Sequence, residues 1–405
     1  MNLKRYIVLV VAAMMAVGAW AQNATSSPTS RFGYGELNNN LPGAYRGMGG
    51  VGIGMRSNKV INPAQPASYT SCDSMTFMFD IAGSLLYTNY GDSYGQSNKV
   101  NGNLEYMTMQ FPIWRQHIAM SLGVTPYSAV GYNFALTDSI NQDYYYSQKY
   151  RGTGGFTQVY GGLSANICDW VALGVNVYYM FGNIEQSRGL SFTDATMDSV
   201  QMVERLSANS LRLRYGMQVF HTFGKHTVNM GAVYENKQPF SRMNYEQIEM
   251  TTADTISNIS TGFDMPMMYG VGLSYSYANR WLIGADYMCH DWANANYFGQ
   301  TQSLKKRHRM ALGAEYRNDP TSRKYVDQIY WRLGVNYTTA YTNRYNEAEW
   351  GVSMGVGFPL RTAGTVINTT LEYGKRGTRN VLSENYLRLV VNASISEHWF
   401  FKRKL

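Results

Sequence analysis

The sequence is poor in charge, proline and cysteine, and beyond its first residues it lacks long apolar runs. Charged residues make up 15% of its 405 residues, whereas soluble domains carry roughly a quarter. No run of about 18 apolar residues follows the amino terminus, so membrane-spanning helices are not expected. Cys72, Cys168 and Cys289 are odd in number and far apart, so they predict no disulfide framework. These shortages argue against both a large soluble domain and a helical membrane protein.

What the sequence has instead is 33 tyrosines, 39 glycines and a mean hydropathy of −0.31. A transmembrane β-barrel has this composition, because its apolar surface is spread over alternate residues of many strands. The composition therefore predicts an all-β, antiparallel transmembrane barrel.

The amino terminus predicts export. Lys4 and Arg5 precede an apolar run over residues 7–17, and Ala19-Trp20-Ala21 supplies a small-x-small cleavage site. Residues 1–21 are therefore predicted to be a secretory signal peptide. An exported chain with a dispersed net charge of +8 is not expected to bind nucleic acid.

Period-two alternation locates the strands. In WVALGVNVYY, from Trp170, one face carries Val171, Leu173, Val175 and Val177, and YGVGLSYSY, from Tyr269, behaves in the same way. Such segments predict about fourteen strands, an even number as in single-chain bacterial barrels. The strands are expected near 74–89, 99–110, 117–137, 143–167, 170–186, 200–222, 226–238, 264–278, 280–294, 305–318, 327–342, 347–359, 364–376 and 384–400.

Charged and aromatic residues orient these strands. Arg212, Arg214, Arg332 and Arg388 share a face with small and polar residues, and an arginine facing lipid costs about 2–4 kcal/mol, so these side chains should point into a lumen. The charges expected to line the lumen are Arg212, Arg214, Asp286, Glu315, Arg317, Arg332, Glu372 and Arg388. They either form a selectivity feature or only satisfy one another. Tryptophans at strand ends, Trp170, Trp281, Trp331, Trp350 and Trp399, are expected in interfacial girdles.

Connection lengths predict the sidedness of the barrel in the outer membrane. Short turns occur at NICDW, FGK and YANR, and longer links at 187–199, 239–263 and 376–383. Because short turns face the periplasm, both termini are expected there.

Residues 22–72 precede the first strand and lack sustained alternation, so we expect a hatch that plugs the lumen of a barrel formed by residues 73–405. Its GMGGVG stretch, residues 47–52, matches a dinucleotide fingerprint but lacks the flanking strand and helix that such a site needs. No cofactor, metal or enzyme activity is therefore expected. The glycines at 47, 49, 50, 52 and 54 should instead let the hatch backbone approach the wall closely.

A family resemblance agrees with this interpretation. The stretch AYRGMGGVGIGMRSNKVINPAQPASY, with Asn62-Pro63-Ala64, resembles the amino-terminal hatch of the FadL/TodX family of outer-membrane transporters of hydrophobic compounds. TGGFTQVYGGLSANI, EWGVSMGVGFPL and LEYGKRGT are similar to the version of that family found in Bacteroidetes. This chain has Arg56-Ser57-Asn58-Lys59 where familiar members have an acidic step.

The resemblance implies a 14-stranded barrel that passively transports hydrophobic or amphipathic, fatty-acid-like molecules to the outer-membrane lipid. Gly47, Gly49, Gly50, Gly52, Gly54, Asn62, Pro63 and Ala64 are the candidate gate residues, although Asn62–Ala64 equally fit a fixed turn. The alternative is a PorV-like barrel that docks proteins of type IX secretion. Uptake predicts an apolar pocket beside the hatch and a break in the wall, whereas docking predicts an exposed partner surface such as TGFDMPMM, residues 261–268.

Overall fold

The computed structural model describes residues 25–39, 41–92, 95–141, 144–192, 199–250, 255–258, 262–301, 304–319, 321–343, 348–360, 364–377 and 382–398. The predicted signal peptide and Trp399 lie outside these residues. The short helices are η1 (Pro28–Arg31), α2 (Gly43–Arg46), η2 (Pro66–Ser71), η3 (Trp292–Asn294) and η4 (Tyr325–Gln328). No helix of the described residues is long and apolar enough to cross a membrane.

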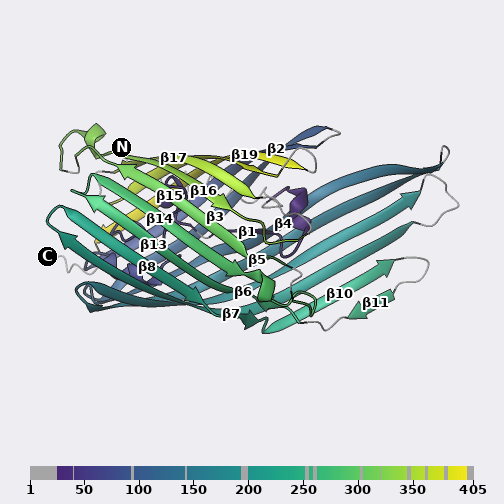
Figure 1. Cartoon of the computed structure of the whole chain (residues 1–405), viewed down its shortest axis with the longest axis horizontal. Coiled ribbons are helices and arrows are strands. Elements are labelled where there is room, and N and C mark those ends of the chain that lie inside the picture. Colours follow the sequence, from purple (N-terminus) through teal and green to yellow (C-terminus); the bar gives the residue numbers. More distant parts are fainter. Residues whose placement is uncertain are drawn as a thin grey trace, which may run out of the picture.

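Fourteen strands close into one antiparallel barrel (Figure 1), which confirms the predicted fold class. β2 to β8 pair in sequence, β8 pairs with β13, β13 to β19 pair in sequence, and β19 pairs with β2. The barrel strands are β2 (Thr76–Gly91), β3 (Gln96–Trp114), β4 (Ile118–Asn141), β5 (Tyr144–Cys168), β6 (Val171–Phe192), β7 (Val200–Phe223), β8 (His226–Glu235), β13 (Met267–Tyr277), β14 (Trp281–Asp291), β15 (Arg307–Tyr316), β16 (Tyr330–Thr338), β17 (Glu349–Pro359), β18 (Val366–Arg376) and β19 (Ser383–His398).

The two faces of each strand divide as the alternation predicts. On β13, Tyr269, Val271 and Leu273 are exposed on the outside, whereas Ser274 is buried in the lumen. Trp170, Trp281, Trp331 and Trp350 are exposed at or beside strand ends, where a membrane interface favours tryptophan.

The wall is much taller on one side. β4 to β7 have 22 to 25 residues, whereas β13 to β18 have 9 to 11, and in Figure 1 the long strands project to the right. Their tall end also carries β10 (Arg242–Met250), which pairs with β7, and β11 (Thr255–Asn258). Two short strands, β9 (Gln238–Pro239) and β12 (Asp264–Met265), pair with each other nearby.

The prediction of a loop over 239–263 was therefore wrong in part. β10 is mostly polar, RMNYEQIEM, and lacks the alternating apolar face by which membrane strands were recognised. The backbone of β10 pairs with the part of β7 that extends past the shorter barrel strands. An apolar outer face is not required at this height.

The two described ends of the chain lie at opposite ends of the barrel. β19 ends at His398 beside the start of β2, at the short-turn end. Thr25 donates a hydrogen bond to Glu36, and Ser27 donates one to Glu384 near the start of β19, so the hatch begins at the tall end. The hatch, residues 25–72, then runs through the lumen, where most of its residues are buried.

A track of glycines on the wall receives the hatch. Nine consecutive strands, β5 to β8 and β13 to β17, each place at least one glycine where an added Cβ would meet the hatch. These wall glycines are Gly162, Gly174, Gly216, Gly231, Gly270, Gly272, Gly284, Gly313, Gly334 and Gly355. At Gly334 the added Cβ would overlap backbone atoms of Met48 and Gly49, which cannot rotate away. Hatch and wall therefore pack backbone to backbone along part of the track, with hatch backbone atoms among the nearest at Gly174, Gly231, Gly272, Gly313, Gly334 and Gly355.

Substituting Gly334→Ala should displace the hatch, because the methyl group occupies the position of the Met48–Gly49 peptide. Overpacking of this kind costs about 1–3 kcal/mol. Limited proteolysis in detergent should cleave the hatch of the variant faster and thermal unfolding should begin at a lower temperature. Gly189→Ala is the matched control, since its nearest neighbour is the Lys149 Cβ at 3.9 Å. Equal behaviour of the two variants would contradict backbone packing at Gly334.

Candidate functional site: hatch, outer cavity and wall break

Wall charges hold the glycine loop of the hatch through its backbone. The Asp286 carboxylate accepts hydrogen bonds from the N–H groups of Gly52, Ile53 and Gly54, at 2.5, 2.8 and 3.3 Å. Arg309 donates to the carbonyl oxygens of Gly49 and Gly50, at 2.8 and 3.1 Å. Gly49 and Gly50 have φ of +69° and +74°, a conformation that favours glycine. The loop is thus fixed in the lumen by one buried carboxylate and one buried guanidinium.

The Asn62-Pro63-Ala64 signature forms a turn in which each residue takes part in a hydrogen bond. The Asn62 amide donates to the Gly52 carbonyl at 2.7 Å, and Tyr178 donates to the Pro63 carbonyl at 3.0 Å. Arg214 donates to the Ala64 carbonyl at 3.4 Å. These bonds favour the fixed turn over the hinge, and a gating role for these residues stays a proposal.

The predicted lumen charges fall into separate groups. Arg212 and Arg214 both pair with the buried Glu235, and Arg332 pairs with Glu315 at 2.7 Å. Glu372 pairs with Arg388 and with Arg46 of the hatch, and Arg46 also pairs with Glu105 at 2.6 Å. Arg317 contacts no carboxylate among the described residues but donates to Tyr330 at 2.8 Å.

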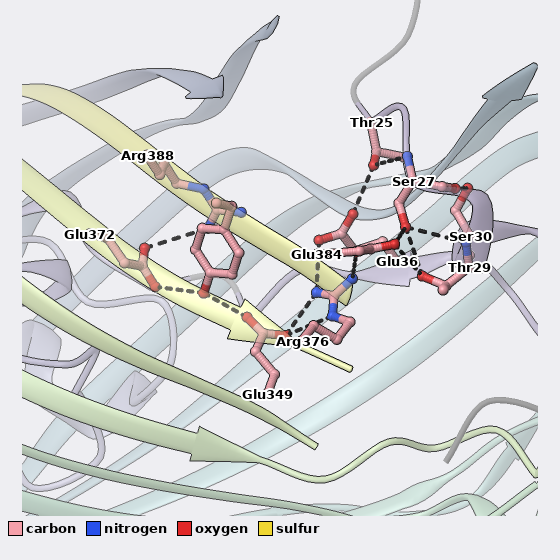
Figure 2. Close-up of polar contacts among 12 residues, drawn as sticks. Thr25, Ser27, Thr29, Ser30, Glu36, Glu349, Glu372, Arg376, Glu384 and Arg388 are labelled. Atoms are coloured by element: carbon pink, nitrogen blue, oxygen red, sulfur yellow. Dashed lines mark hydrogen bonds and ion pairs between the residues drawn. The ribbon is translucent and has the colours of Figure 1, made fainter. Parts of the chain in front are cut away.

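A partly buried hub at the tall end was missed from the sequence (Figure 2). Arg376 contacts three carboxylates, those of Glu36 in the hatch, Glu349 and Glu384, at 3.0, 2.7 and 3.4 Å. Glu384 also accepts a hydrogen bond from Ser27 of the hatch. The sequence signal was weak because these residues stand at strand ends, where loop charges are expected. The hub joins the start of the hatch to β17, β18 and β19.

Two hatch groups have displaced pKa values. Burial alone would raise the pKa of the Glu36 carboxyl, but the charges of Arg376 and Arg388 outweigh burial and hold it below its ordinary value. Burial lowers the pKa of the Arg56 guanidinium to about 10, so it remains a cation at neutral pH.

An aromatic cluster covers the hatch at the tall end. Hatch residue Tyr34 is buried, and its ring centroid lies 5.3 Å from those of Trp292 and Tyr297. Tyr341 donates to the Gly35 carbonyl at 2.6 Å and accepts from the Tyr34 N–H at 3.0 Å. Phe263, Met265 and Met268 of the expected docking edge are buried rather than exposed; Thr261 lies outside the described residues.

A cavity of about 540 Å³ lies beside this cluster. The hatch contributes Arg31, Phe32 and Gly33 to its lining. The barrel side contributes aromatic and polar side chains, namely Tyr132, Tyr150, Tyr245, Tyr297, Phe298, Leu304, Gln186, Arg188, Glu204 and Gln300. Such a mixed apolar and polar lining suits an amphipathic molecule.

The wall has a break between β3 and β4. The two strands pair only from Met107↔Val124 to Trp114↔Ile118, and above this level β3 pairs with β2 alone. The free edge of β4 is met by the hatch strand β1 (Glu36–Leu37), in which Leu37 lies opposite Ser128. A cavity of about 270 Å³ opens at the break, lined by hatch residues 36–39, β3 and β4, with Arg307, Arg376 and Arg388 behind them. The hatch therefore pairs with part of the β4 edge that β3 leaves open.

His290 and Asp291 are the last residues of β14, and Asp291 pairs with Lys306 at 3.3 Å. Among the described residues, no group of three or more histidine, cysteine or carboxylate side chains could hold a metal ion.

Three solved structures resemble this fold. A FadL homologue from Pseudomonas aeruginosa has a TM-score of 0.62 and 12% identity, covering 90% of this chain and 100% of that one. The Ralstonia pickettii toluene transporter TbuX has a TM-score of 0.61 and 13% identity over 89% and 98% of the two chains. The CymD monoaromatic hydrocarbon channel has a TM-score of 0.58 and 12% identity over 88% and 98%. The chain thus has the fold of the FadL/TodX-type outer-membrane barrels.

Comparison of the sequence with protein-family models identifies the family. A model of the BamG family matches residues 3–405, so the chain belongs to the BamG family. No curated protein is significantly similar to it.

Substituting Arg376→Gln should loosen the start of the hatch, because three neighbouring carboxylates then lose the cation that they share. Since the hub is only partly buried, the cost should lie below the ~3–5 kcal/mol of a fully buried pair. Hydrogen exchange of residues 25–37 should accelerate while that of Gly52–Gly54 changes little. Arg205→Gln, at an exposed pair, is the control; unchanged exchange in Arg376→Gln would contradict the hub.

Acidification should also release this end of the hatch. Because the pKa of Glu36 is lower in the folded protein, its contribution to stability is complete above its ordinary pKa of about 4.3 and is lost as the pH falls through the lower, folded value. Protease sensitivity of residues 25–37 should therefore rise below about pH 4.3. Glu36→Gln should flatten this dependence, and an equally steep dependence in that variant would assign it to another group.

Proposed function

We propose that this protein is a passive outer-membrane transporter of hydrophobic or amphipathic small molecules, gated by the hatch. The observation that carries the proposal is the break between β3 and β4, where the hatch strand β1 pairs with the free edge of β4. A molecule held in the 540 Å³ outer cavity already contacts the hatch at Arg31–Gly33, a few residues before β1. Displacement of this segment would join the cavity to the break.

The mobile part of the gate is, in this proposal, residues 25–39 rather than the Gly47–Gly54 loop. The loop packs on wall backbone and is bonded to Asp286 and Arg309, whereas β1 has only two paired residues. Charged groups line the break, and exposed apolar side chains such as Val100, Leu104 and Val124 flank it. Charged groups inside the break and apolar side chains beside it suit an amphipathic molecule that leaves through the wall into the lipid. Its apolar part would leave first, and its polar group would be released last.

The short-turn end is proposed to face the periplasm and the tall end the exterior, as in single-chain bacterial barrels. This orientation puts the described end of β19 on the periplasmic side, while Thr25 lies at the outer end of the lumen. The amino terminus itself lies outside the described residues, and its expected periplasmic position stays a proposal.

A disulfide between Leu37→Cys and Ser128→Cys tests the gate, because these residues are direct antiparallel partners. In proteoliposomes, oxidation should abolish uptake of a fluorescent fatty acid, and a reductant should restore it. The two single-cysteine variants are the controls for the native Cys72, Cys168 and Cys289. Full uptake by the oxidised pair would overturn gating by β1.

Mass spectrometry after extraction in mild detergent separates transport from protein docking. Uptake predicts a co-purifying amphipathic small molecule that is lost when Phe298→Trp narrows the outer cavity. A stoichiometric protein partner with no small molecule would favour the docking alternative instead.

A further inference from the structure

A third cavity, of about 460 Å³, lies at the short-turn end of the lumen and is strongly basic. It is bounded by hatch residues 56–60 and by residues of β8, β13 to β16 and β18. Its charged lining residues are Arg56, Lys59, Arg280, Arg317, Arg332 and Glu315, five cations and one anion.

Tyr330 gathers three of these cations. Its hydroxyl oxygen accepts hydrogen bonds from Lys59 Nζ at 3.1 Å and from an Arg317 guanidinium nitrogen at 2.8 Å. The Lys59, Arg317 and Arg332 cations lie 5.9, 4.8 and 5.0 Å from the centre of the Tyr330 ring. One neutral phenol therefore holds a hatch cation and two wall cations close together.

Their charge is mostly uncompensated. Arg332 pairs with Glu315, but among the described residues no carboxylate lies within 4.0 Å of Arg56, Lys59, Arg280 or Arg317. Of the nearby loop carboxylates, Asp327 is bonded to Asn318, and Asp319 is bonded to Thr321 and interacts with Arg280 and Arg317 only through longer-range attraction. Like charges gathered at a partly dry site repel strongly unless an anion lies between them.

The hatch part of this cluster is the segment Arg56-Ser57-Asn58-Lys59. Asn58 is exposed and Lys59 is half-buried, so the segment is open to solution at this end. Arg56 is held over the Phe220 ring at 4.0 Å and bonded to the Ala67 carbonyl, which fixes the segment without neutralising it.

We propose that this cavity is a binding site for a phosphate-type oxyanion, which bridges Lys59 of the hatch with Arg317 and Arg280 of the wall. Ammonium and guanidinium groups are the usual partners of phosphate, and the planar guanidinium binds two of its oxygens at once. Such an anion links the hatch to the wall at the end opposite the Arg376 hub. The proposed anion site does not depend on the transport proposal, and it is the same for any transported molecule.

Calorimetric titration of the full-length protein in non-ionic detergent tests the site, with pyrophosphate as the probe and ionic strength held constant. We expect saturable binding that weakens about tenfold or more in Lys59→Gln/Arg317→Gln, which removes two charged contacts. Arg323→Gln/Lys324→Gln is the matched control, since it removes the same charge from an exposed loop at the same end and should bind as the wild type does.

Absence of saturable binding, an equal loss in the control, or wild-type affinity in Lys59→Gln/Arg317→Gln would each overturn the proposal. Binding of an acidic peptide without binding of pyrophosphate would overturn it too, in favour of a protein partner. Tighter binding of glycerophosphate than of pyrophosphate would support the site and identify a lipid head group as its ligand. Tighter binding of pyrophosphate would support the site and identify a free anion as its ligand. If the double variant does not fold, as judged by thermal unfolding, Lys59→Gln alone gives the same comparison.

Discussion

Close packing of the hatch backbone against the wall backbone is the constraint on which the other features depend. It requires glycine on both sides, and the wall supplies at least one on each of nine consecutive strands. Side chains in those places would hold the two backbones apart and leave polar groups of the hatch without partners. The same closeness brings the N–H groups of Gly52–Gly54 to Asp286 and the carbonyl groups of Gly49 and Gly50 to Arg309. Glycine placement thus decides which wall charges reach the hatch.

The charges inside this barrel mostly bind the hatch or one another. Arg214 contacts Ala64, Arg46 contacts Glu105, and Arg376 contacts Glu36, so wall and hatch neutralise each other across their interface. Buried pairs of this kind contribute little net stability but make partial separation costly, because each separation leaves an ion without a partner in a dry place. Movement of residues 25–39 would separate Glu36 from Arg376, so displacement of this segment carries the cost of that pair.

The sequence was sufficient for the barrel and less so for its interior. Alternation over β13 and β16 located strands and faces because lipid imposes period two on the outer surface. The same rule assigned Arg332 and Arg388 to the lumen, but it could not pair them, since pairing depends on the stagger between neighbouring strands. Arg307 and Arg309 alternate with Met310 and Leu312 and were open to the same inference. The break between β3 and β4 left no local signal, because both strands alternate normally on either side of it.

The glycine track also bears on the order of assembly. The hatch is the first part of the mature chain to be made, yet the surface that receives it extends from β5 to β17 and exists only after almost all of the chain has been exported. The hatch can therefore pack in the lumen only after the last of these strands, β17, has joined the barrel. Until the barrel has closed, the glycines of the hatch and its cations without carboxylate partners are exposed. At that stage the protein is most accessible to binding partners and to proteases.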